Sequence, residues 1–233
     1  MKLHLNKNHK NNNSELFKLI TKKSKKLREN LFKSFSRLIS CIEILSDKKI
    51  KSFLKKKNYK NLALISFSVV VMEPNRKKFL FPVHQDLKNR LSNKSILMWI
   101  PLNKSKGSLG GVTLYKNSHK LGLLKHEIGH SGIMQLKSKS QQKIAKLQKI
   151  DFNKYNVGDV LFISPFLVHK SINNINKKDS RWTLIIQVDD LTSTKHFSKS
   201  LNPYDVDYHS ASLTNEETRK KENYVNNNNN YNF

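Results

Sequence analysis

The stretch Pro82-Val83-His84-Gln85-Asp86 is the part of this chain on which the interpretation of fold and function depends. It lies in residues 80–86, a run with the composition of a β-strand. Side chains alternate between the two faces of a strand, so His84 and Asp86 leave it on the same face. An imidazole and a carboxylate placed together can bind one metal ion, and this combination suits iron(II). The stretch therefore predicts two of the three protein ligands of an iron site.

The second half of the chain supplies a candidate for the third ligand. A turn at Gly158-Asp159 leads into the apolar run 160–164, and His169 follows shortly afterwards. Two histidines and one carboxylate on one face of an octahedral metal ion leave three coordination positions open. The predicted iron site therefore consists of His84, Asp86 and His169.

Arg181 is the candidate anchor for a cosubstrate. The residues between His169 and Arg181 are rich in Asn, Lys and Asp, which predicts a hairpin about Ile175 with the two side chains roughly 5 Å apart across paired strands. Such an arginine can form a bidentate pair with the far carboxylate of a dicarboxylic cosubstrate. Thr183 is expected on the same strand face and would add a hydroxyl hydrogen bond. The alternative for Arg181 is an ordinary surface charge.

The remaining pattern predicts a mainly β fold with helices at the N-terminus. After residue 60, short β-branched and aromatic runs alternate with turn residues, which favours a barrel or sandwich with helices packed outside. The expected strands are residues 62–72, 80–86, 95–102, 111–115, 160–164 and 182–188.

Four segments are expected along the chain. Residues 1–13 are polar and predicted to be disordered, and residues 14–60 form a helical segment packed on the barrel, with a helix cap at Ser46-Asp47. Residues 61–190 form the β core, interrupted by a lysine-rich loop and helix insert at 120–150, in which 141–150 is expected to be helical. Residues 191–233 form a C-terminal extension with an Asn-rich disordered tail.

Composition narrows the function classes. The formal net charge is +27, which raises the alternative of a basic protein that binds nucleic acid. Only six of the 44 basic residues are arginine, the better donor to phosphates and bases, so a solvated lysine surface is favoured over a nucleic-acid partner. Cys41 is the single cysteine, which excludes an intrachain disulfide and a cysteine-rich zinc site. The start has no apolar signal region and no run reaches membrane-spanning length, so a cytoplasmic protein with no membrane partner is expected.

A competing metal motif stands at His126-Glu127-Ile128-Gly129-His130. It matches HExxH, in which two histidines one helical turn apart bind zinc and the glutamate activates water. The extended form of that motif needs a further histidine where Leu136 stands, and the other common form needs a downstream glutamate, yet the next one is Glu216. We therefore interpret the motif as a polar loop near the barrel mouth. A substrate contact by one of its histidines is the alternative.

The order of motifs along the chain resembles the phytanoyl-CoA dioxygenase-like family. The matching elements are His84-Gln85-Asp86, Trp99-Ile100-Pro101-Leu102, the glycine-to-lysine motif at 110–120, Gly158-Asp159-Val160-Leu161-Phe162, His169-Lys170-Ser171 and Arg181. The resemblance implies a double-stranded β-helix, that is, a jelly-roll barrel of the cupin type. It also implies an iron(II)- and 2-oxoglutarate-dependent dioxygenase that uses O2 and releases succinate and CO2.

The resemblance also implies roles for individual residues. The iron ligands fall on His84, Asp86 and His169, and the 2-oxoglutarate-binding arginine falls on Arg181. Gln85, Trp99 and Ser171 match positions beside the cosubstrate, although a core aromatic is an equal interpretation of Trp99. Asp86 favours hydroxylation, because related halogenases have a small residue there. Asn117 replaces the family's usual glycine, a mild change because asparagine tolerates a left-handed turn.

The sequence does not identify the substrate. A small molecule is expected, and the lysine-rich insert near the predicted barrel mouth favours an anionic one. Two alternatives stay open beside the oxygenase: a non-catalytic or cupin-type metal-binding barrel without 2-oxoglutarate chemistry, and a basic nucleic-acid-associated protein. The sequence does not indicate an oligomeric state.

Overall fold

A computed structural model describes residues 38–74, 80–86, 94–129 and 133–192, together with Asn30 and Ser34. The predicted disordered ends and most of residues 14–37 of the predicted helical segment lie outside the described residues. The segment boundaries proposed above, and the cytoplasmic location, therefore stay predictions.

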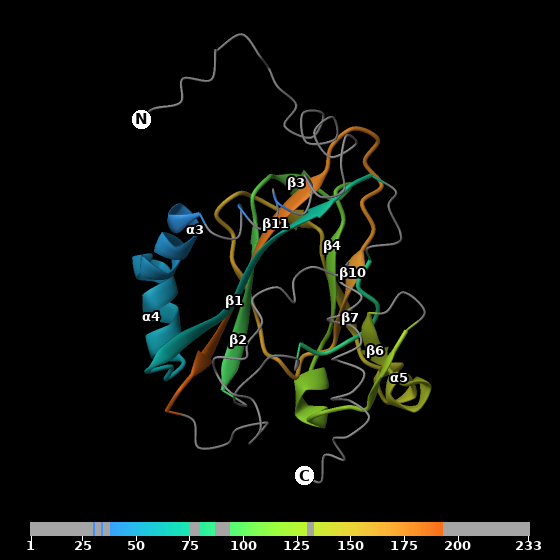
Figure 1. The fold of residues 1–233 in the computed structure, drawn as a ribbon. Coiled ribbons are helices and arrows are strands. Elements are labelled where there is room, and N and C mark those ends of the chain that lie inside the picture. Colours follow the sequence, from blue (N-terminus) through green and yellow to red (C-terminus); the bar gives the residue numbers. More distant parts are fainter. Residues whose placement is uncertain are drawn as a thin grey trace.

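Two antiparallel sheets form the body of the molecule (Figure 1). The larger sheet has the order β1-β11-β2-β9, with the bounds β1 Leu62–Met72, β11 Arg181–Asp190, β2 Ser95–Pro101 and β9 Leu161–Ile163. The smaller sheet has the order β10-β4-β7, with the bounds β10 His169–Ile172, β4 Gly111–Tyr115 and β7 Lys149–Phe152. Strands distant in sequence are neighbours in both sheets, as in a jelly roll.

Shorter elements surround the two sheets. Two small ribbons pair β3 Ser105–Lys106 with β8 Lys154–Tyr155, and β5 His126–Ile128 with β6 Met134–Leu136. The helical elements are α3 Ile39–Glu43, η1 Ile44–Ser46, α4 Lys48–Lys56, η3 Ser118–Leu121 and α5 Ser138–Ile144. None of the helices in the described ranges is long and apolar enough to cross a membrane.

The larger sheet buries both of its faces, and the two faces have different roles. On the outer face Leu184, Ile186 and Val188 of β11 pack with Ile50 and Leu54 of α4. On the inner face, apolar side chains of β2 and β9 meet those of the smaller sheet in a second cluster that includes Leu97, Trp99, Val112, Tyr155 and Ile163. The alternation of side chains along one strand therefore directs half of β11 toward the helix and half toward the barrel interior.

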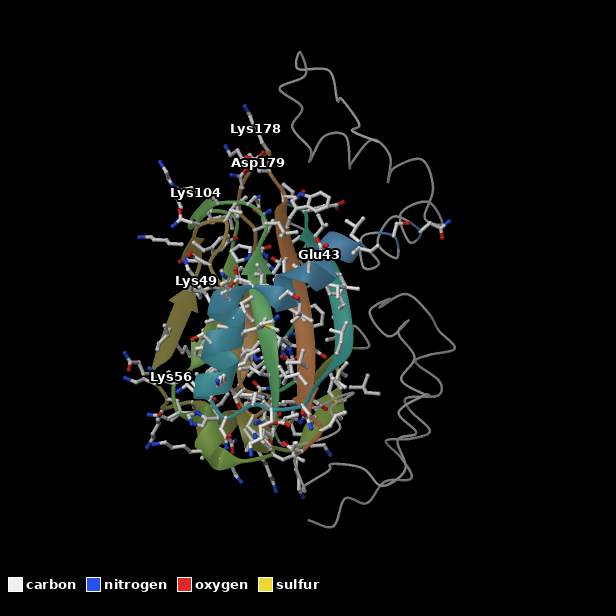
Figure 2. All side chains as sticks on the ribbon, turned by 90° about the vertical axis from the view of Figure 1, so that its left-hand side faces the viewer. Glu43, Lys49, Lys56, Lys104, Lys178 and Asp179 are labelled. Atoms are coloured by element: carbon white, nitrogen blue, oxygen red, sulfur yellow. The ribbon has the colours of Figure 1, made fainter. Side chains whose placement is uncertain are left out.

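Helix α4 lies across the outer face of the larger sheet (Figure 2). The Asp47 carboxylate caps it by accepting hydrogen bonds from the backbone N–H groups of Lys49 at 2.8 Å and Ile50 at 3.1 Å, so the predicted cap is confirmed. The lysines of α4 are exposed, and Lys49 and Lys56 project from the helix in Figure 2. In this part of the chain the positive charge is the solvated side of an amphipathic helix.

Most of the predicted strands are confirmed, and two local predictions are wrong. Residues 80–86 form no strand; their only strand-like pairing is an isolated bridge between His84 and His169. The helix expected over 141–150 is α5, which ends at Ile144, and Lys149 already belongs to β7. The β7 residues pair with β4 because Asp151 accepts a hydrogen bond from Thr113 and Phe152 joins the interior cluster. These tertiary contacts outweigh local helix preference.

A buried carboxylate fastens three chain segments at the end of β11. Asp190 is fully buried and accepts hydrogen bonds from Lys94 Nζ at 2.7 Å and from the backbone N–H groups of Lys60 at 3.0 Å and Thr192 at 3.0 Å. Burial alone would raise the pKa of Asp190, but the hydrogen bonds from Lys94, Thr192 and Lys60 outweigh it and hold that pKa far below its usual range.

We expect Asp190→Asn to lower the free energy of unfolding by about 3 kcal/mol, because Lys94 then loses its buried partner. Since folding depresses the pKa of Asp190, its contribution is present above about pH 4 and is lost as the pH falls below that value. Urea unfolding of both proteins at pH 7 and in acid measures this difference. Asp159→Asn, in an exposed turn, is the control; an equal loss in both variants would contradict the assignment.

Candidate metal centre

The backbones of two predicted ligands are joined directly. The His84 N–H donates to the His169 carbonyl at 3.0 Å, and the His169 N–H donates to the His84 carbonyl at 3.0 Å. The two imidazole rings lie 4.3 Å apart between centroids. This reciprocal bridge brings residue 84 and residue 169 together although they are far apart in sequence.

The three predicted ligands converge on one point. His84, Asp86 and His169 each offer a ligand atom, and these atoms lie within 4.8 Å of one another. The Asp86 carboxylate is 3.5 Å from Nε2 of His84 and 3.2 Å from Nε2 of His169. The spacing of two residues between His84 and Asp86 thus places both side chains together, even though no continuous strand carries them.

The hydrogen bonds of the two imidazoles set their tautomer. Nδ1 of His84 lies 2.7 Å from the Pro82 carbonyl oxygen and Nδ1 of His169 lies 3.0 Å from the Leu167 carbonyl oxygen, so each Nδ1 is the donor. In the neutral rings both Nε2 lone pairs then face the Asp86 carboxylate. That arrangement needs a positive charge between the three groups, either protons on the imidazoles or a metal cation. Histidine ligands of metals commonly have this second hydrogen bond, so the donor set fits a divalent metal ion.

The Asp86 side chain is ionised in this environment. Burial raises its pKa, but the charge and hydrogen bond of His169 and those of His84 outweigh burial and hold the pKa of Asp86 well below its usual range. Asp86 therefore supplies a carboxylate, the form that a metal ion requires.

Arg181 approaches the site by a route different from the predicted one. Its strand β11 pairs with β1 and β2, whereas β10 pairs with β4, so the expected hairpin between His169 and Arg181 is wrong. The Arg181 guanidinium instead crosses to the smaller sheet, where Nη1 donates to the carbonyls of Gly111 at 3.1 Å and Ile172 at 3.2 Å. The connection 173–180 passes from one sheet to the other and does not fold back on β10.

The Arg181 guanidinium is a buried cation that forms no ion pair with a carboxylate in the described ranges. The side chain is 2% exposed, and its Nε has no hydrogen-bond partner there. Burial lowers the pKa of Arg181 to about 10, so the group still carries its charge at neutral pH. An uncompensated buried charge is costly, which makes this position suited to an anionic ligand. The surface-charge alternative for Arg181 is therefore wrong.

Further predicted residues lie on the inner face near Arg181. Thr183 is 1% exposed and its hydroxyl has no hydrogen-bond partner in the described chain. The Trp99 ring centroid lies 5.9 Å from the Arg181 guanidinium carbon and 5.2 Å from the Tyr155 ring centroid. Trp99 is thus a core aromatic that also borders the arginine. Tyr155 was missed from the sequence, because a single tyrosine before a Gly-Asp turn carries no functional pattern.

The polar atoms of Gln85 and Ser171 are engaged by the backbone. The Gln85 amide donates to the carbonyls of Phe166 at 2.7 Å and Gly122 at 2.9 Å, which uses both of its hydrogens. The Ser171 hydroxyl accepts from the Phe81 N–H at 3.3 Å. Both residues therefore tie the segment 81–85 to its neighbours, and their predicted contact with a cosubstrate stays a prediction.

The Asn117-Ser118 turn supports the strand that carries His169. Asn117 has φ 65°, the left-handed conformation expected where the resembling family has glycine. The following Ser118 is fully buried, and its hydroxyl accepts from the Val168 N–H at 2.8 Å. The turn thus holds the residue that precedes His169.

The HExxH motif does not form a zinc site in the described part of the chain. His126, Glu127 and Ile128 form strand β5, whereas the zinc motif needs a helix, and His130 lies outside the described residues. Nδ1 of His126 donates to the Leu124 carbonyl at 2.8 Å, and Nε2 accepts from the Gln85 N–H at 3.2 Å. Burial lowers the pKa of His126, which favours this neutral form.

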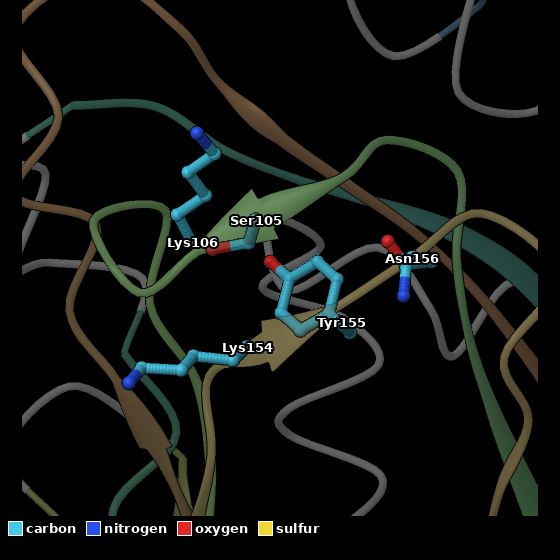
Figure 3. Close-up of a pocket in the computed structure, with 5 residues that line it drawn as sticks. All are labelled: Ser105, Lys106, Lys154, Tyr155 and Asn156. Carbon is cyan, nitrogen blue, oxygen red and sulfur yellow. The ribbon is translucent and has the colours of Figure 1, made fainter.

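A hollow of about 370 Å³ lies beside the small β3–β8 ribbon (Figure 3). Its lining residues are Ser105, Lys106, Lys154, Tyr155 and Asn156. No member of the triad is among these lining residues. Tyr155 links the two regions, because the same ring packs against Trp99 on the barrel interior.

The fold and the site together define a class of protein, a double-stranded β-helix with a His-Asp-His triad. Comparison with solved structures agrees with this fold. The epimerase SnoN, solved in complex with Fe3+, alpha ketoglutarate and nogalamycin RO, superimposes with a TM-score of 0.54 at 16% identity, covering 66% of this chain and 60% of SnoN. EctD from S. alaskensis, solved with 2-oxoglutarate and 5-hydroxyectoine, gives 0.50 at 13% identity, covering 65% of this chain and 52% of EctD.

The sequence comparisons name the family. The model of the phytanoyl-CoA dioxygenase family matches residues 4–182, and the chain belongs to that family. The 1-deoxypentalenic acid 11-beta-hydroxylase of Streptomyces exfoliatus is 29% identical over 136 residues, which cover 54% of this chain and 46% of the relative. The enzyme of the same name from Streptomyces arenae is 30% identical over 106 residues, covering 42% of this chain and 36% of the relative. The chain therefore matches less than half the length of these curated relatives.

The left-handed turn at Asn117 can be tested by substitution. We expect Asn117→Gly to change the free energy of unfolding by less than about 0.5 kcal/mol, because glycine adopts this conformation readily. Asn117→Val should lower it by about 1–2 kcal/mol, since a β-branched residue is strained there. Urea unfolding of the three proteins measures both effects. Equal stability of the Gly and Val variants would refute the strain argument.

Proposed function

We propose that the protein is an iron(II)- and 2-oxoglutarate-dependent dioxygenase that hydroxylates a small molecule. In this proposal His84, Asp86 and His169 hold the iron, and Arg181 binds the 5-carboxylate of 2-oxoglutarate. The single observation that carries the proposal is the pairing of a His-Asp-His triad with a buried arginine that forms no ion pair with a carboxylate in the described ranges.

The spacing between the triad and Arg181 suits this cosubstrate. Arg181 donates to the Ile172 carbonyl, and Ile172 stands three residues beyond His169 on β10. At about 3.3 Å per residue, the two points are roughly 10 Å apart along the strand. A five-carbon diacid that binds a metal through one end and an arginine through the other spans a gap of this size. Thr183 and Trp99 would border the intervening chain.

The residues have separate tasks in the reaction. With iron bound, oxidative decarboxylation of 2-oxoglutarate by O2 gives succinate and CO2 and supplies the oxidant for a C–H bond. The triad would supply the protein ligands of the iron, and 2-oxoglutarate and O2 would bind at the positions left open. Arg181 would orient 2-oxoglutarate and neutralise its distal charge, beside the Trp99 ring. Asp86 fills the carboxylate position, which favours hydroxylation over halogenation.

We infer further that the substrate is anionic. Lys120 and Lys125 are exposed on either side of residues 122–124, whose backbone contacts Gln85 between the two ligands His84 and Asp86. The relatives from Streptomyces are named for an acid substrate, which agrees with a carboxylate partner for these lysines.

The cupin-type alternative without 2-oxoglutarate differs from the main proposal in leaving Arg181 without a ligand.

The iron site is tested by anaerobic titration. We expect iron(II) and 2-oxoglutarate together, but neither alone, to give a weak visible charge-transfer band with the purified protein. His169→Ala should abolish the band, because the triad loses a ligand. His119→Ala, an exposed histidine outside the triad, is the control and should keep it. Absence of the band from the unaltered protein, together with no release of succinate, would sink the proposed function.

The cosubstrate anchor is tested separately through Arg181. We expect Arg181→Lys to raise the KM for 2-oxoglutarate at least about tenfold, because lysine keeps the charge but loses the bidentate fork. Succinate release measures this, and the iron(II) affinity without 2-oxoglutarate should stay unchanged. An unaltered KM in a folded variant would favour the cupin-type alternative.

A further inference from the structure

Gln85, the residue between the two ligands His84 and Asp86, is hydrogen-bonded to strand β5. The Gln85 N–H donates to Nε2 of His126 at 3.2 Å. Nδ1 of His126 donates to the Leu124 carbonyl at 2.8 Å, which leaves Nε2 as the acceptor. The first histidine of the HExxH motif is thus committed to the backbone of the ligand segment.

The Gln85 side chain also forms hydrogen bonds with the backbone just before His126. Its Oε1 accepts from the Leu124 N–H at 2.9 Å and its Nε2 donates to the Gly122 carbonyl at 2.9 Å. We call residues 122–126 the clasp segment. Backbone and side chain of Gln85 therefore both bind this segment, and the side-chain amide also donates to the Phe166 carbonyl at 2.7 Å.

The clasp segment is itself anchored to the body of the protein. Leu124 is 5% exposed and belongs to a buried cluster with Leu136 and Val168, against which Val83 packs. The Lys125 carbonyl accepts from the Lys137 N–H at 3.0 Å, which joins the segment to the end of β6. A partner anchored in this way can fix the position of Gln85.

Main-chain hydrogen bonds fix the ligand segment up to His84, since the Phe81 carbonyl accepts from the Ser171 N–H at 3.0 Å and the Val83 carbonyl accepts from the Leu136 N–H at 2.8 Å. Within the described residues 80–86, His84 alone forms a strand-like bridge. The bridge fixes the backbone at His84, but Asp86 lies two residues further on, beyond this pairing. The peptide at Gln85 is the connection between them, and the direction of this peptide decides where the Asp86 carboxylate points.

We propose that His126 is a positioning residue for the metal centre, which fixes the Gln85 peptide and so holds Asp86 against His84 and His169. The proposal rests on the proposed function, because it assigns His126 to the same iron site. Its alternative is a histidine that only packs. In the positioning role, iron binding depends on a hydrogen-bond acceptor at the place of His126 Nε2; in the packing role it does not.

A matched pair of variants separates these two roles. His126→Gln places an amide oxygen near the position of Nε2, and His126→Asn places its amide near the position of Nδ1, too short to reach the Gln85 N–H. We expect His126→Asn to weaken iron(II) binding in the presence of 2-oxoglutarate about tenfold, the scale seen when a hydrogen bond behind a metal site is removed. His126→Gln should restore the affinity to within about threefold of the unaltered protein.

The measurement is the anaerobic iron(II) titration by the charge-transfer band, with urea unfolding of the metal-free proteins beside it. A packing role would lower the stability of both variants and leave their iron affinities equal, which would overturn the proposal. Glu127→Gln is the control within the same motif; its carboxylate contacts Gln135 on the exposed hairpin and should not affect iron binding. If His126→Asn does not fold, His126→Leu, which keeps bulk without an acceptor, replaces it.

The outcome is distinguishable from failure of the proposed function. If the unaltered protein gives no band, the oxygenase proposal fails and the role of His126 fails with it. If the unaltered protein gives the band and His126→Asn matches it in iron affinity, only the positioning role is wrong.

Discussion

The reciprocal hydrogen bonds between the backbones of His84 and His169 are the constraint on which the candidate centre depends. They join a segment that forms no strand to the edge of the smaller sheet. Together with the hydrogen bonds between Phe81 and Ser171, they fix the HxD segment against β10, where the three ligand atoms converge. The pairing acts directly on the two histidines, whereas Asp86 lies two residues further along the chain. The hydrogen bonds to Gln85 hold the peptide between His84 and Asp86.

The second constraint is the division of β11 between two environments. Its outer side chains belong to the core with α4, and that core holds the strand rigidly. Its inner side chains include Arg181, a buried charge whose Nη1 is satisfied by the carbonyls of Gly111 and Ile172. Gly111 can hold this place because it lacks a side chain; a Cβ there would lie 2.0 Å from the Phe152 carbonyl oxygen. Of the glycine pair at 110–111, Gly110 adopts the positive φ of the turn, and Gly111 accepts the hydrogen bond from Arg181.

What could be predicted from the sequence follows from what each pattern encodes. The bounds of β1 and β4 match the predicted ones because β-branched and aromatic runs bounded by turn residues are typical of strands. The triad was predicted as a set because metal ligands are few in type and their spacing is restrictive. The hairpin to Arg181 was wrong because a polar connection of this length fits a turn within a sheet and a crossing between sheets equally well. The partners of Gln85 and His126 could not be predicted, since backbone groups accept and donate without leaving a trace in the sequence.

Three histidines of this protein share one local construction, and their different roles follow from what stands opposite. His84, His126 and His169 each direct Nδ1 at the carbonyl two residues earlier, so each presents Nε2 as a lone pair. In two of them that lone pair faces the Asp86 carboxylate, an arrangement stable only with a positive charge between the groups. In the third it faces the Gln85 N–H, which satisfies it without a cation. The same ring geometry thus gives two candidate metal ligands, His84 and His169, and one proposed positioning residue, His126. A histidine motif can bind a metal only where its Nε2 atoms lie close to a further metal-ligand atom, here the Asp86 carboxylate.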